Sequence, residues 1–530
     1  MDWSIFVRNL FGLFVLVSGV VHAAPIFLAR VGLGASEGLT AVAPLAAVVA
    51  DLGDFCLVRA SDAELSSLAA QGFDVAVLDR VGDEDYYFVQ AAADFDQDLL
   101  AGCCRVLDRY ARGFIVAATE EGVRELNRMP VELARVAREP VLLSGRSARL
   151  PALPAVDDSL VWRLVNSVDA DTVLGNIRRL QNFLTRYSTT ESLRQACSWM
   201  RAKLTTFGCD SAWLDTWSSQ YAPNVVGVKT GKTTPGLIYI IDGHIDNTSD
   251  RQPDSCPGAD DNASGTAAVI EAARVFADVD FACTVWFIGF SGEEQGLLGS
   301  GDFAQRCRAR GDSVCGVFNF DMISYGRQDL DSFRVIGTPS NPDCSWLIDF
   351  YIAQADTFSA LKPIRIMDAG ARYSDHSSFW DQGYVAFCGI EDDFTPEYHT
   401  LGDTIGPLYY VNCGTNNWLM ATEAIRAAVA SIAKLAGASP RTGVEEETPS
   451  RPVRIARVIP TVGRAPVALR FTQKPPRGTS VEIYNGDGRL VDALPVSNSA
   501  AEWQGSAAGV YFLRLTDGGV SSAAKVVLTD

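Results

Sequence analysis

Beyond the N-terminal apolar segment, three histidines and two acid pairs could together hold a metal ion. The histidines lie in Ile-Asp-Gly-His-Ile-Asp, Ser-Asp-His-Ser-Ser and Tyr-His-Thr-Leu-Gly-Asp, as His244, His376 and His399. The acid pairs are Asp260-Asp261 and Glu293-Glu294. Neutral imidazole with carboxylates, and no thiolate in the same segments, is the donor set of a catalytic zinc site. These residues predict metal-assisted hydrolysis.

Short apolar runs come just before most of these groups. The runs are Leu237 to Ile241, Thr284 to Phe290 and Val317 to Phe320. They are typical of parallel strands buried on both faces, and helical stretches such as Gly265 to Phe276 separate them. In such sheets the carboxyl ends of the strands build the site. We expect an α/β catalytic domain over residues 156–437, with a mainly parallel sheet flanked by helices.

Five segments in this order carry a family resemblance. They are His244-Ile-Asp246, Pro257-Gly-Ala-Asp-Asp-Asn-Ala-Ser-Gly265, Ser291-Gly-Glu-Glu-Gln-Gly296, Asn319-Phe-Asp-Met322 and Tyr398-His-Thr-Leu-Gly-Asp-Thr404. The region from about residue 160 to 437 resembles the co-catalytic di-zinc aminopeptidases, which include secreted bacterial leucyl aminopeptidases (zinc exopeptidase fold). The resemblance implies two Zn²⁺ ions per chain and peptide or protein substrates.

The resemblance also implies a role for each ligand. Asp260 would bridge the two ions, Glu294 and His399 would complete one site, and His244 and Asp321 would complete the other. A cis peptide is expected between Asp260 and Asp261.

The catalytic roles follow the same pattern. Glu293, next to a ligand, would be the general base that takes a proton from water and passes it to the leaving amine. Two divalent ions can lower the pKa of a shared water and polarise the scissile carbonyl. Asp246 is expected to accept a hydrogen bond from His244 and fix its tautomer, and Asp403 could do the same for His399.

Several neighbours of these residues have open roles. Asp261 is either a site residue or the cap of the following helix. His376, beside Asp375, is expected to be a hydrogen-bonded structural residue, because five ligands already suffice. Tyr373 is a candidate hydrogen-bond donor to the transition state, although some relatives place this tyrosine where the chain has Ala371.

The N-terminal part has two sections. Residues 1–23, with Arg8 before an apolar run, are expected to be a signal peptide that directs the protein to the exterior or the cell surface. Residues 24–155 contain a repeated strand–helix–strand pattern, with Ser61 and Thr119 as matching helix N-caps. We expect a small α+β domain of ferredoxin-like type, acting as a prosegment that restrains activity or as an accessory domain.

The C-terminal part changes character after the catalytic region. Residues 438–452 are expected to be a linker, and residues 453–530 an immunoglobulin-like β-sandwich with a hairpin around Asn485-Gly-Asp-Gly488. The segments Val481 to Val491 and Gly509 to Leu515 resemble the sorting domain of bacterial type IX secretion. The resemblance implies a contact with that secretion machinery, and an ordinary accessory sandwich is the alternative.

The overall composition limits the partners. The chain has 530 residues and a net charge of −19, which argues against nucleic acid and anionic membrane surfaces. After residue 23 no apolar run is long enough to span a bilayer, so we expect no stable membrane insertion, and we expect a monomer. Twelve cysteines in an exported chain suggest disulfides, with Cys197–Cys209 and Cys307–Cys315 as local candidates.

Other functions compete with an aminopeptidase. Glutaminyl cyclase-like acyltransferases share this fold but use one zinc, and they usually alter the Asp-Asp-Asn-Ala-Ser-Gly segment and the paired glutamates. A dipeptidase or carboxypeptidase of the same fold stays possible, because the loops around the pocket are not readable from the sequence. A receptor ectodomain with a decayed site is disfavoured by the intact Glu293 and ligand set.

Overall fold

A computed structural model describes most of the chain, which divides into two compact units, Met1–Pro440 and Arg441–Asp530. The described residues are 25–34, 38–91, 95–142, 155–326, 332–393, 395–405, 418–441, 455–459, 462–463, 466–471, 479–486, 489–496, 500–505, 507–517 and 520–529. The expected signal peptide and most of the expected linker lie outside these residues.

The catalytic domain is built on a mixed sheet with the strand order β16-β15-β17-β14-β11-β13-β10-β9. The central strands β17, β14, β11 and β13 run parallel, while β10 and β9 at one edge and the β15–β17 pair are antiparallel. Their bounds are β9 (Ser211–Asp215), β10 (Asn224–Lys229), β11 (Thr234–His244), β13 (Cys283–Phe290), β14 (Ser313–Phe320), β15 (Ser332–Gly337), β16 (Lys362–Met367) and β17 (Ala386–Glu391). The expected α/β class is confirmed, with antiparallel strands added around a parallel centre.

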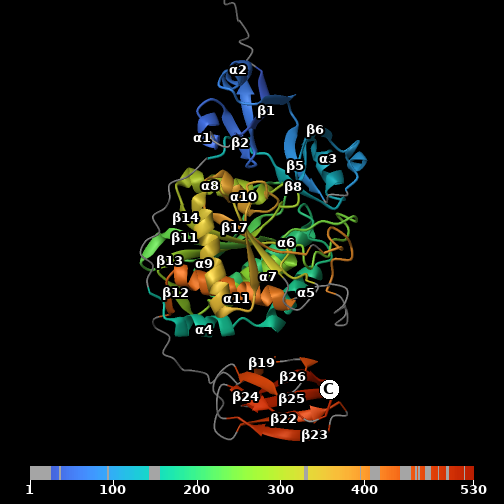
Figure 1. Ribbon diagram of the computed structural model, residues 1–530, viewed down its shortest axis with the longest axis vertical. Helices are drawn as coiled ribbons and strands as arrows, with labels where there is room; N and C mark the ends of the chain where they lie inside the picture. The colour runs from blue at the N-terminus through green and yellow to red at the C-terminus, as the bar shows by residue number, and fades with distance from the viewer. Residues whose placement is uncertain are drawn as a thin grey trace, which may run out of the picture. The chain divides into compact units, whose positions relative to one another are not determined.

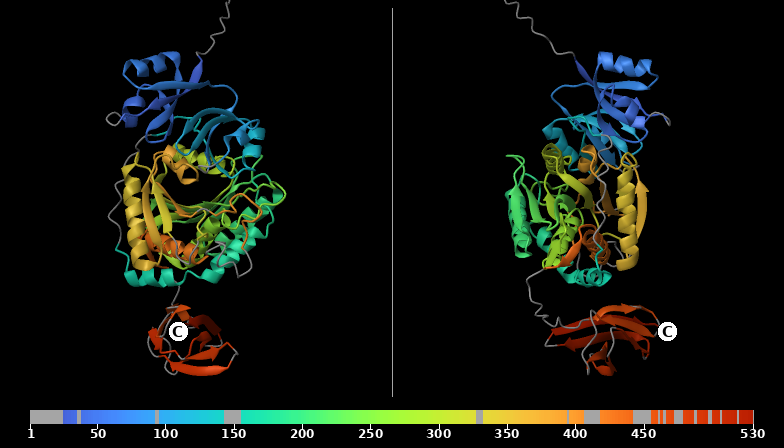
Figure 2. Two further views of the ribbon diagram at one scale, coloured as in Figure 1. Left: turned by 45° about the vertical axis from the view of Figure 1, so that its right-hand side comes forward. Right: turned by 90° about the vertical axis from the view of Figure 1, so that its left-hand side faces the viewer.

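Helices cover both faces of this sheet, as the views in Figure 2 show. The larger core packs against α4 (Asp158–Asn166), α5 (Ala170–Gln181), α6 (Glu191–Thr206), α7 (Ala263–Val275), α9 (Pro342–Phe358) and α11 (Trp418–Leu435). The second core packs against α8 (Leu298–Arg310) and α10 (His376–Asp381). In Figure 1, α8 and α10 lie toward the N-terminal region, and α4, α5 and α11 lie on the far side.

The N-terminal region consists of two units with the same topology. The first is β1 (Ile26–Gly32), α1 (Gly38–Val42), β2 (Ala47–Asp51), β3 (Phe55–Ser61), α2 (Asp62–Ala70) and β4 (Val75–Arg80). The second is β5 (Asp85–Ala91), η1 (Gln97–Leu100), β6 (Arg105–Tyr110), β7 (Gly113–Ala118), α3 (Glu120–Leu126) and β8 (Val131–Arg135). We call them the first and second repeat.

Each repeat has its own four-stranded antiparallel sheet, with the orders β2-β3-β1-β4 and β6-β7-β5-β8. Ser61 forms a capping box with Glu64 on α2, and the Thr119 hydroxyl accepts from the amide of Gly122 on α3 at 3.2 Å. The predicted repeat and both caps are therefore present. The region differs from a single ferredoxin-like sheet because each repeat closes its own sheet around its own apolar core.

The second unit is a β-sandwich of a three-stranded sheet, β19-β21-β24, and a five-stranded sheet, β20-β26-β25-β22-β23. Its strands are β19 (Ile455–Ile459), β20 (Val462–Gly463), β21 (Val467–Phe471), β22 (Ser480–Asn485), β23 (Leu490–Pro495), β24 (Ala500–Trp503), β25 (Gly509–Asp517) and β26 (Val520–Leu528). The predicted hairpin forms between β22 and β23. Trp503 and Leu513 are among the residues buried between the sheets.

The described cysteines are all free, so the two local disulfides expected above do not form. The Cys197 thiol donates instead to the carbonyl of Pro223 at 3.3 Å, and Cys307 accepts from the Arg310 guanidinium at 3.2 Å. Burial raises the pKa of Cys209 and of Cys307 to about 12, so both thiols stay protonated. Within the described ranges, no helix combines the length and the apolar character that crossing a membrane requires.

Candidate metal centre

The candidate ligands gather where the central strands end. His244 is the last residue of β11, Asp321 directly follows β14, and the glutamate pair follows β13. Asp261 precedes α7, whose N-cap Asn262 accepts from the amide of Gly265 at 2.7 Å. His399 lies in the loop after β17 and has a left-handed backbone with φ of 55°. All the candidate ligands except His399 thus lie at or just after a strand end, or at a capped helix start, where the backbone is held in place.

Asp261 lies between the two histidines. Its Oδ1 is 3.3 Å from Nε2 of His244, and its Oδ2 is 3.1 Å from Nε2 of His399. Beyond His244, Oδ1 of Asp321 lies 3.1 Å from the same Nε2, and beyond His399, Oε2 of Glu294 lies 3.1 Å from its Nε2. One carboxylate therefore faces two separate groups of ligands.

Asp260, the residue expected in this position, points elsewhere. Its Oδ1 accepts from the amide and the hydroxyl of Ser324, both at 2.9 Å, and its carboxyl also interacts with Glu391. The cis peptide is likewise one residue later than expected, between Asp261 and Asn262. The structure thus replaces Asp260 by Asp261 as the candidate bridging ligand.

Asp403 also differs from its expected role. Its two carboxylate oxygens accept from the amides of Asp260 at 2.8 Å and Asp261 at 3.0 Å. Nδ1 of His399 instead faces the carbonyl of Met129 at 3.2 Å. Asp403 therefore fixes the backbone that carries the candidate bridging carboxylate of Asp261, and a carbonyl of the N-terminal region orients His399.

Asp246 holds the glutamate pair in place. Its carboxylate accepts from the hydroxyl of Ser188 and from the amides of Glu293 at 3.3 Å and Glu294 at 3.4 Å. The nearest partner of Nδ1 of His244 is the backbone carbonyl of Asp246 at 3.2 Å, whereas the carboxylate is 3.9 Å away. Asp246 thus orients His244 through its main chain and the glutamates through its side chain.

Arg186 ties two ligand-bearing segments together. Its fully buried guanidinium donates to the carbonyls of Ile245, Pro257 and Gly258 at 2.8 to 2.9 Å. These carbonyls flank His244 on one side and Asp261 on the other. A planar group with several fixed donors suits such a junction, and a lysine could not reproduce it.

His376 and Tyr373 lie near the site without joining the ligand cluster. Nε2 of His376 lies 2.8 Å from the carbonyl of Ala371, to which it can donate, and Nδ1 lies 3.2 Å from Oδ1 of Asn319. Burial lowers the pKa of His376 to about 3, which keeps the ring neutral. Tyr373 is buried beside Tyr398 in a small apolar cluster.

The second repeat of the N-terminal region reaches this site. The side-chain amide of Asn127 donates to the carbonyl of Glu294 at 2.6 Å, and the Thr248 hydroxyl donates to the carbonyl of Asn127 at 2.9 Å. Glu132 lies on β8, the edge strand of its sheet, and burial followed by the charge of Glu132 raises the pKa of the Tyr398 hydroxyl. The sequence analysis missed these residues, because none of them belongs to a motif that could be recognised from spacing.

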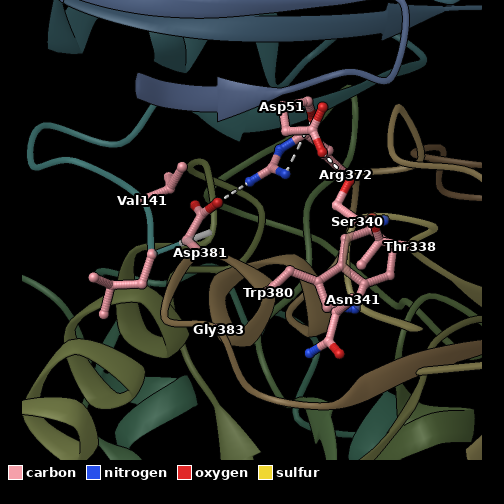
Figure 3. A pocket seen from close by; sticks show the side chains of 10 residues that line it. Asp51, Val141, Thr338, Ser340, Asn341, Arg372, Trp380, Asp381 and Gly383 are labelled. Carbon is pink, nitrogen blue, oxygen red and sulfur yellow. Dashed lines mark hydrogen bonds and ion pairs between the residues drawn. The ribbon is translucent and has the colours of Figure 1, made fainter. Parts of the chain in front are cut away.

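Further contacts join the two regions. The amide of Arg135 donates to the carbonyl of Gly296 at 3.4 Å, and a Cβ at Gly296, which has φ of 101°, would lie 2.9 Å from the Tyr87 ring. Figure 3 shows a separate small pocket where Asp51 of the first repeat meets Ser340 and Arg372 of the catalytic domain. Strands β5 and β8 lie on the side of the N-terminal region that faces the catalytic domain (Figure 1).

The donor set fits metal cations. Buried carboxylates at this density repel one another unless positive charge balances them. Burial, followed by the charge of Asp261, raises the pKa of Glu294 to about 7, while the two histidines lower that of Asp261 despite its burial. Among the described residues, neither Oε1 of Glu293 nor Oε1 of Glu294 has a hydrogen-bond partner. Potential ligand atoms lie within 4.8 Å of one another in two groups, which are His244 with Asp261 and Glu294, and His244 with Glu293 and Asp321.

The fold and this donor set define a domain of the zinc peptidase class. Residues 224–423 match the family described as Peptidase family M28. This segment contains His244, Asp261, Glu294, Asp321 and His399.

Similar proteins agree with that class. A "Probable zinc metalloprotease" of Pyricularia oryzae is 32% identical over 225 residues and is matched over 35% of this chain and 45% of its own length. "Leucine aminopeptidase 1" of Phaeosphaeria nodorum is 27% identical over 317 residues, covering 54% of this chain and 79% of its own. The crystal structure of LapB from Legionella pneumophila aligns with a TM-score of 0.52 and 20% identity over 67% of this chain and all of LapB, which shows a shared fold.

Proposed function

We propose that this protein is a zinc aminopeptidase that removes N-terminal residues from peptides. The observation that carries the proposal is the position of Asp261, with one carboxylate oxygen facing each histidine. A carboxylate in that position can hold two cations close together, with Asp321 and Glu294 as the outer ligands. Relatives named as leucine aminopeptidases and zinc metalloproteases support the same class.

The residues of the chain divide the work. His244, Asp261, Glu294, Asp321 and His399 would hold the ions, which supply Lewis acidity toward water and the scissile carbonyl when bound. Asp246 and Asp403 hold the backbones that carry these ligands. Groups that orient metal ligands in this way typically change metal affinity or activity by about 10- to 100-fold.

Glu293 is the proton carrier in this proposal. Its Oε2 is 3.9 Å from Nε2 of His244, and its Oε1 has no hydrogen-bond partner among the described residues. Burial raises the pKa of Glu293 well above its ordinary value, which favours acceptance of a proton from water. Once it has taken this proton, Glu293 can pass it to the leaving amine.

Metal analysis combined with a substrate panel tests the proposal. We expect two zinc ions per purified full-length chain and hydrolysis of aminoacyl amides, with no hydrolysis of the same amides when their amino group is blocked. A content of one zinc per chain that does not rise when zinc is added, together with cyclisation of N-terminal glutamine, would instead identify an acyltransferase. Cleavage of blocked peptides at their C-terminus would identify a carboxypeptidase, and cleavage of dipeptides alone a dipeptidase.

A further inference from the structure

The two histidines of the candidate metal centre take their orientation from different parts of the chain. A neutral imidazole that offers Nε2 to a metal carries its proton on Nδ1, and an acceptor at Nδ1 fixes the ring. For His244 this acceptor is the carbonyl of Asp246 at 3.2 Å, two residues further along the catalytic domain. For His399 it is the carbonyl of Met129 at 3.2 Å, in the second repeat of the N-terminal region. One histidine is therefore oriented by its own domain and the other by the N-terminal region.

The carbonyl of Met129 is held in a tight turn. It also accepts from the amide of Val131 at 2.8 Å, which closes a three-residue turn around Pro130. The proline ring fixes φ at about −65°, close to the value of about −75° that the centre of such a turn adopts. The amide of Met129 donates to the carbonyl of Leu126 at 2.9 Å, so the turn is attached to the end of α3. The acceptor for His399 is thus positioned within the second repeat itself.

The loop that orients His399 also holds Glu294. The side-chain amide of Asn127 donates to the carbonyl of Glu294 at 2.6 Å, and Asn127 is only 1% exposed. Oε2 of Glu294 lies 3.1 Å from Nε2 of His399, on the same side of Asp261. Residues 127–129 therefore contact both ligands that, apart from the bridging aspartate, would hold one of the two ions.

Residues 248–252 of the catalytic domain strengthen this connection. The Thr248 hydroxyl donates to the carbonyl of Asn127 at 2.9 Å, and the amide of Asp250 donates to the carbonyl of His399 at 3.0 Å. His399 has a left-handed backbone, which is strained for a residue other than glycine and persists only where several contacts hold it. The N-terminal region thus supports His399 directly at its ring and, through this segment, at its backbone.

We propose that the second repeat is a lasting part of the metal centre, in which residues 127–129 position His399 and Glu294 and so set the affinity of one of the two zinc sites. The inference rests on the di-zinc site proposed above. It gives the N-terminal region a supporting role, in place of the restraint on activity expected of a removable prosegment. The positioning residues lie outside the segment that matches the peptidase family.

Zinc titration of the full-length chain against a fluorescent chelator tests the proposal. Asn127→Ala removes the donor to Glu294, and Thr248→Val removes the hydroxyl bound to the carbonyl of Asn127 while keeping the side-chain shape. Each substitution should weaken one of the two zinc-binding steps on the order of 10-fold, as for other groups that orient metal ligands. The other binding step should not change. Equal weakening of both steps would overturn the proposal, because it would indicate a general loss of structure.

Thr284→Val is the matched control. The Thr284 hydroxyl also donates to a backbone carbonyl, that of Pro235 at 2.8 Å, and Thr284 is also buried. It lies at the start of β13, whose opposite end precedes Glu293. This variant should lose stability without a change in either zinc-binding step. A loss of zinc affinity equal to that of Thr248→Val would overturn the proposal, since any lost buried hydrogen bond would then have the same effect.

Chains with a single zinc site show which ion is affected. His244→Ala should retain the ion beside His399, and His399→Ala the ion beside His244. Adding Asn127→Ala should weaken the remaining site about 10-fold in the first chain and leave it unchanged in the second. Equal losses in the two chains would contradict a specific role for the N-terminal region.

Activity has opposite signs for the two roles of the N-terminal region. At a zinc concentration that only just saturates the unmodified chain, Asn127→Ala should lower activity on an aminoacyl amide, and excess zinc should restore it. Higher activity in Asn127→Ala or Thr248→Val would overturn the proposal and favour a restraining prosegment. An unmodified chain without zinc or activity would instead refute the proposed function. If that chain bound two zinc ions and hydrolysed the amide, but both variants titrated like it, only the role of residues 127–129 would be overturned.

Discussion

The two repeats of the N-terminal region have the same topology but different surroundings. In each, a capped helix is followed by a loop of equal length, residues 71–74 and 127–130, and then by the last strand, β4 or β8. Aligned in this way, Gln71 corresponds to Asn127 and Ala76 to Glu132. Ala76 and Val77 of the first repeat are exposed, Val77 by 55%. In the second repeat, the loop before β8 contacts the candidate metal centre: Asn127 donates to the carbonyl of Glu294, and the carbonyl of Met129 lies 3.2 Å from Nδ1 of His399.

The comparison shows that topology does not determine what a repeat does. Gln71 of the first repeat is exposed, whereas Asn127 at the matching position of the second repeat donates to the carbonyl of Glu294. Contact with the site therefore depends on a few side chains in one loop. Three pairs of substitutions test this view, beginning with the candidate metal centre that the second repeat contacts.

The largest effect is expected from Glu293→Gln, which removes the proposed general base. Contact with the second repeat bears on function only if the metal centre is catalytic. Loss of the general base should lower kcat on an aminoacyl amide by ~10²–10⁴-fold. The zinc content should stay at its unmodified level, because the side chain keeps its shape and is not one of the five proposed ligands. Glu294→Gln is the matched variant and should lose zinc as well. Full activity in Glu293→Gln would show that the base has been assigned to the wrong residue.

A smaller effect, on zinc binding, is expected to distinguish the neighbouring residues Asp260 and Asp261. Asp261→Asn should weaken zinc binding by about 10- to 100-fold or more, since loss of a supporting group alone has that effect. Asp260→Asn should have little effect, because its oxygen can still accept from Ser324 and its new amide can donate to Glu391. Zinc titration against a fluorescent chelator measures both. Equal losses would restore Asp260 as a candidate ligand.

The smallest effect, on the free energy of unfolding, is expected from substitutions in the two matching loops, residues 71–74 and 127–130. Asn127→Ala removes a buried donor to the carbonyl of Glu294, and an unsatisfied buried group costs roughly 1–3 kcal/mol of stability. Gln71→Ala, at the matching exposed position, should stay within about 0.5 kcal/mol of the unmodified chain. Urea unfolding of the full-length chain at constant zinc measures both values. Equal losses of unfolding free energy in the two variants would mean that the hydrogen bond from Asn127 to Glu294 does not stabilise the contact between the second repeat and the metal centre.

The sequence predicts much of the fold because local signals are strong there. The buried runs before His244 and Glu293 are strands, and the caps Ser61 and Thr119 begin helices as expected. The ends of the strands also bring the ligands together, because a parallel sheet collects them at one edge. In these cases short-range pattern and tertiary structure agree.

The remaining differences come from information that spacing does not contain. Asp260 and Asp261 are neighbours of the same type, and only the path of the backbone decides which carboxylate points to the histidines. Asp403 is close to His399 in sequence, yet its partners are amides in another loop. Asn127 and Met129 come from a region without a recognisable motif, so only the packing of the two regions reveals their contacts with Glu294 and His399.

Arg186 has a consequence for how the site opens. Its guanidinium is shared by the segment after β11 and the segment before α7, so neither can move away without leaving a buried cation short of acceptors. The two segments should therefore exchange their amide hydrogens together, at the slow rate of the core to which β11 belongs. His244, at the end of β11, and Asp261, the candidate bridging ligand before α7, are thus kept or lost as a single cooperative unit.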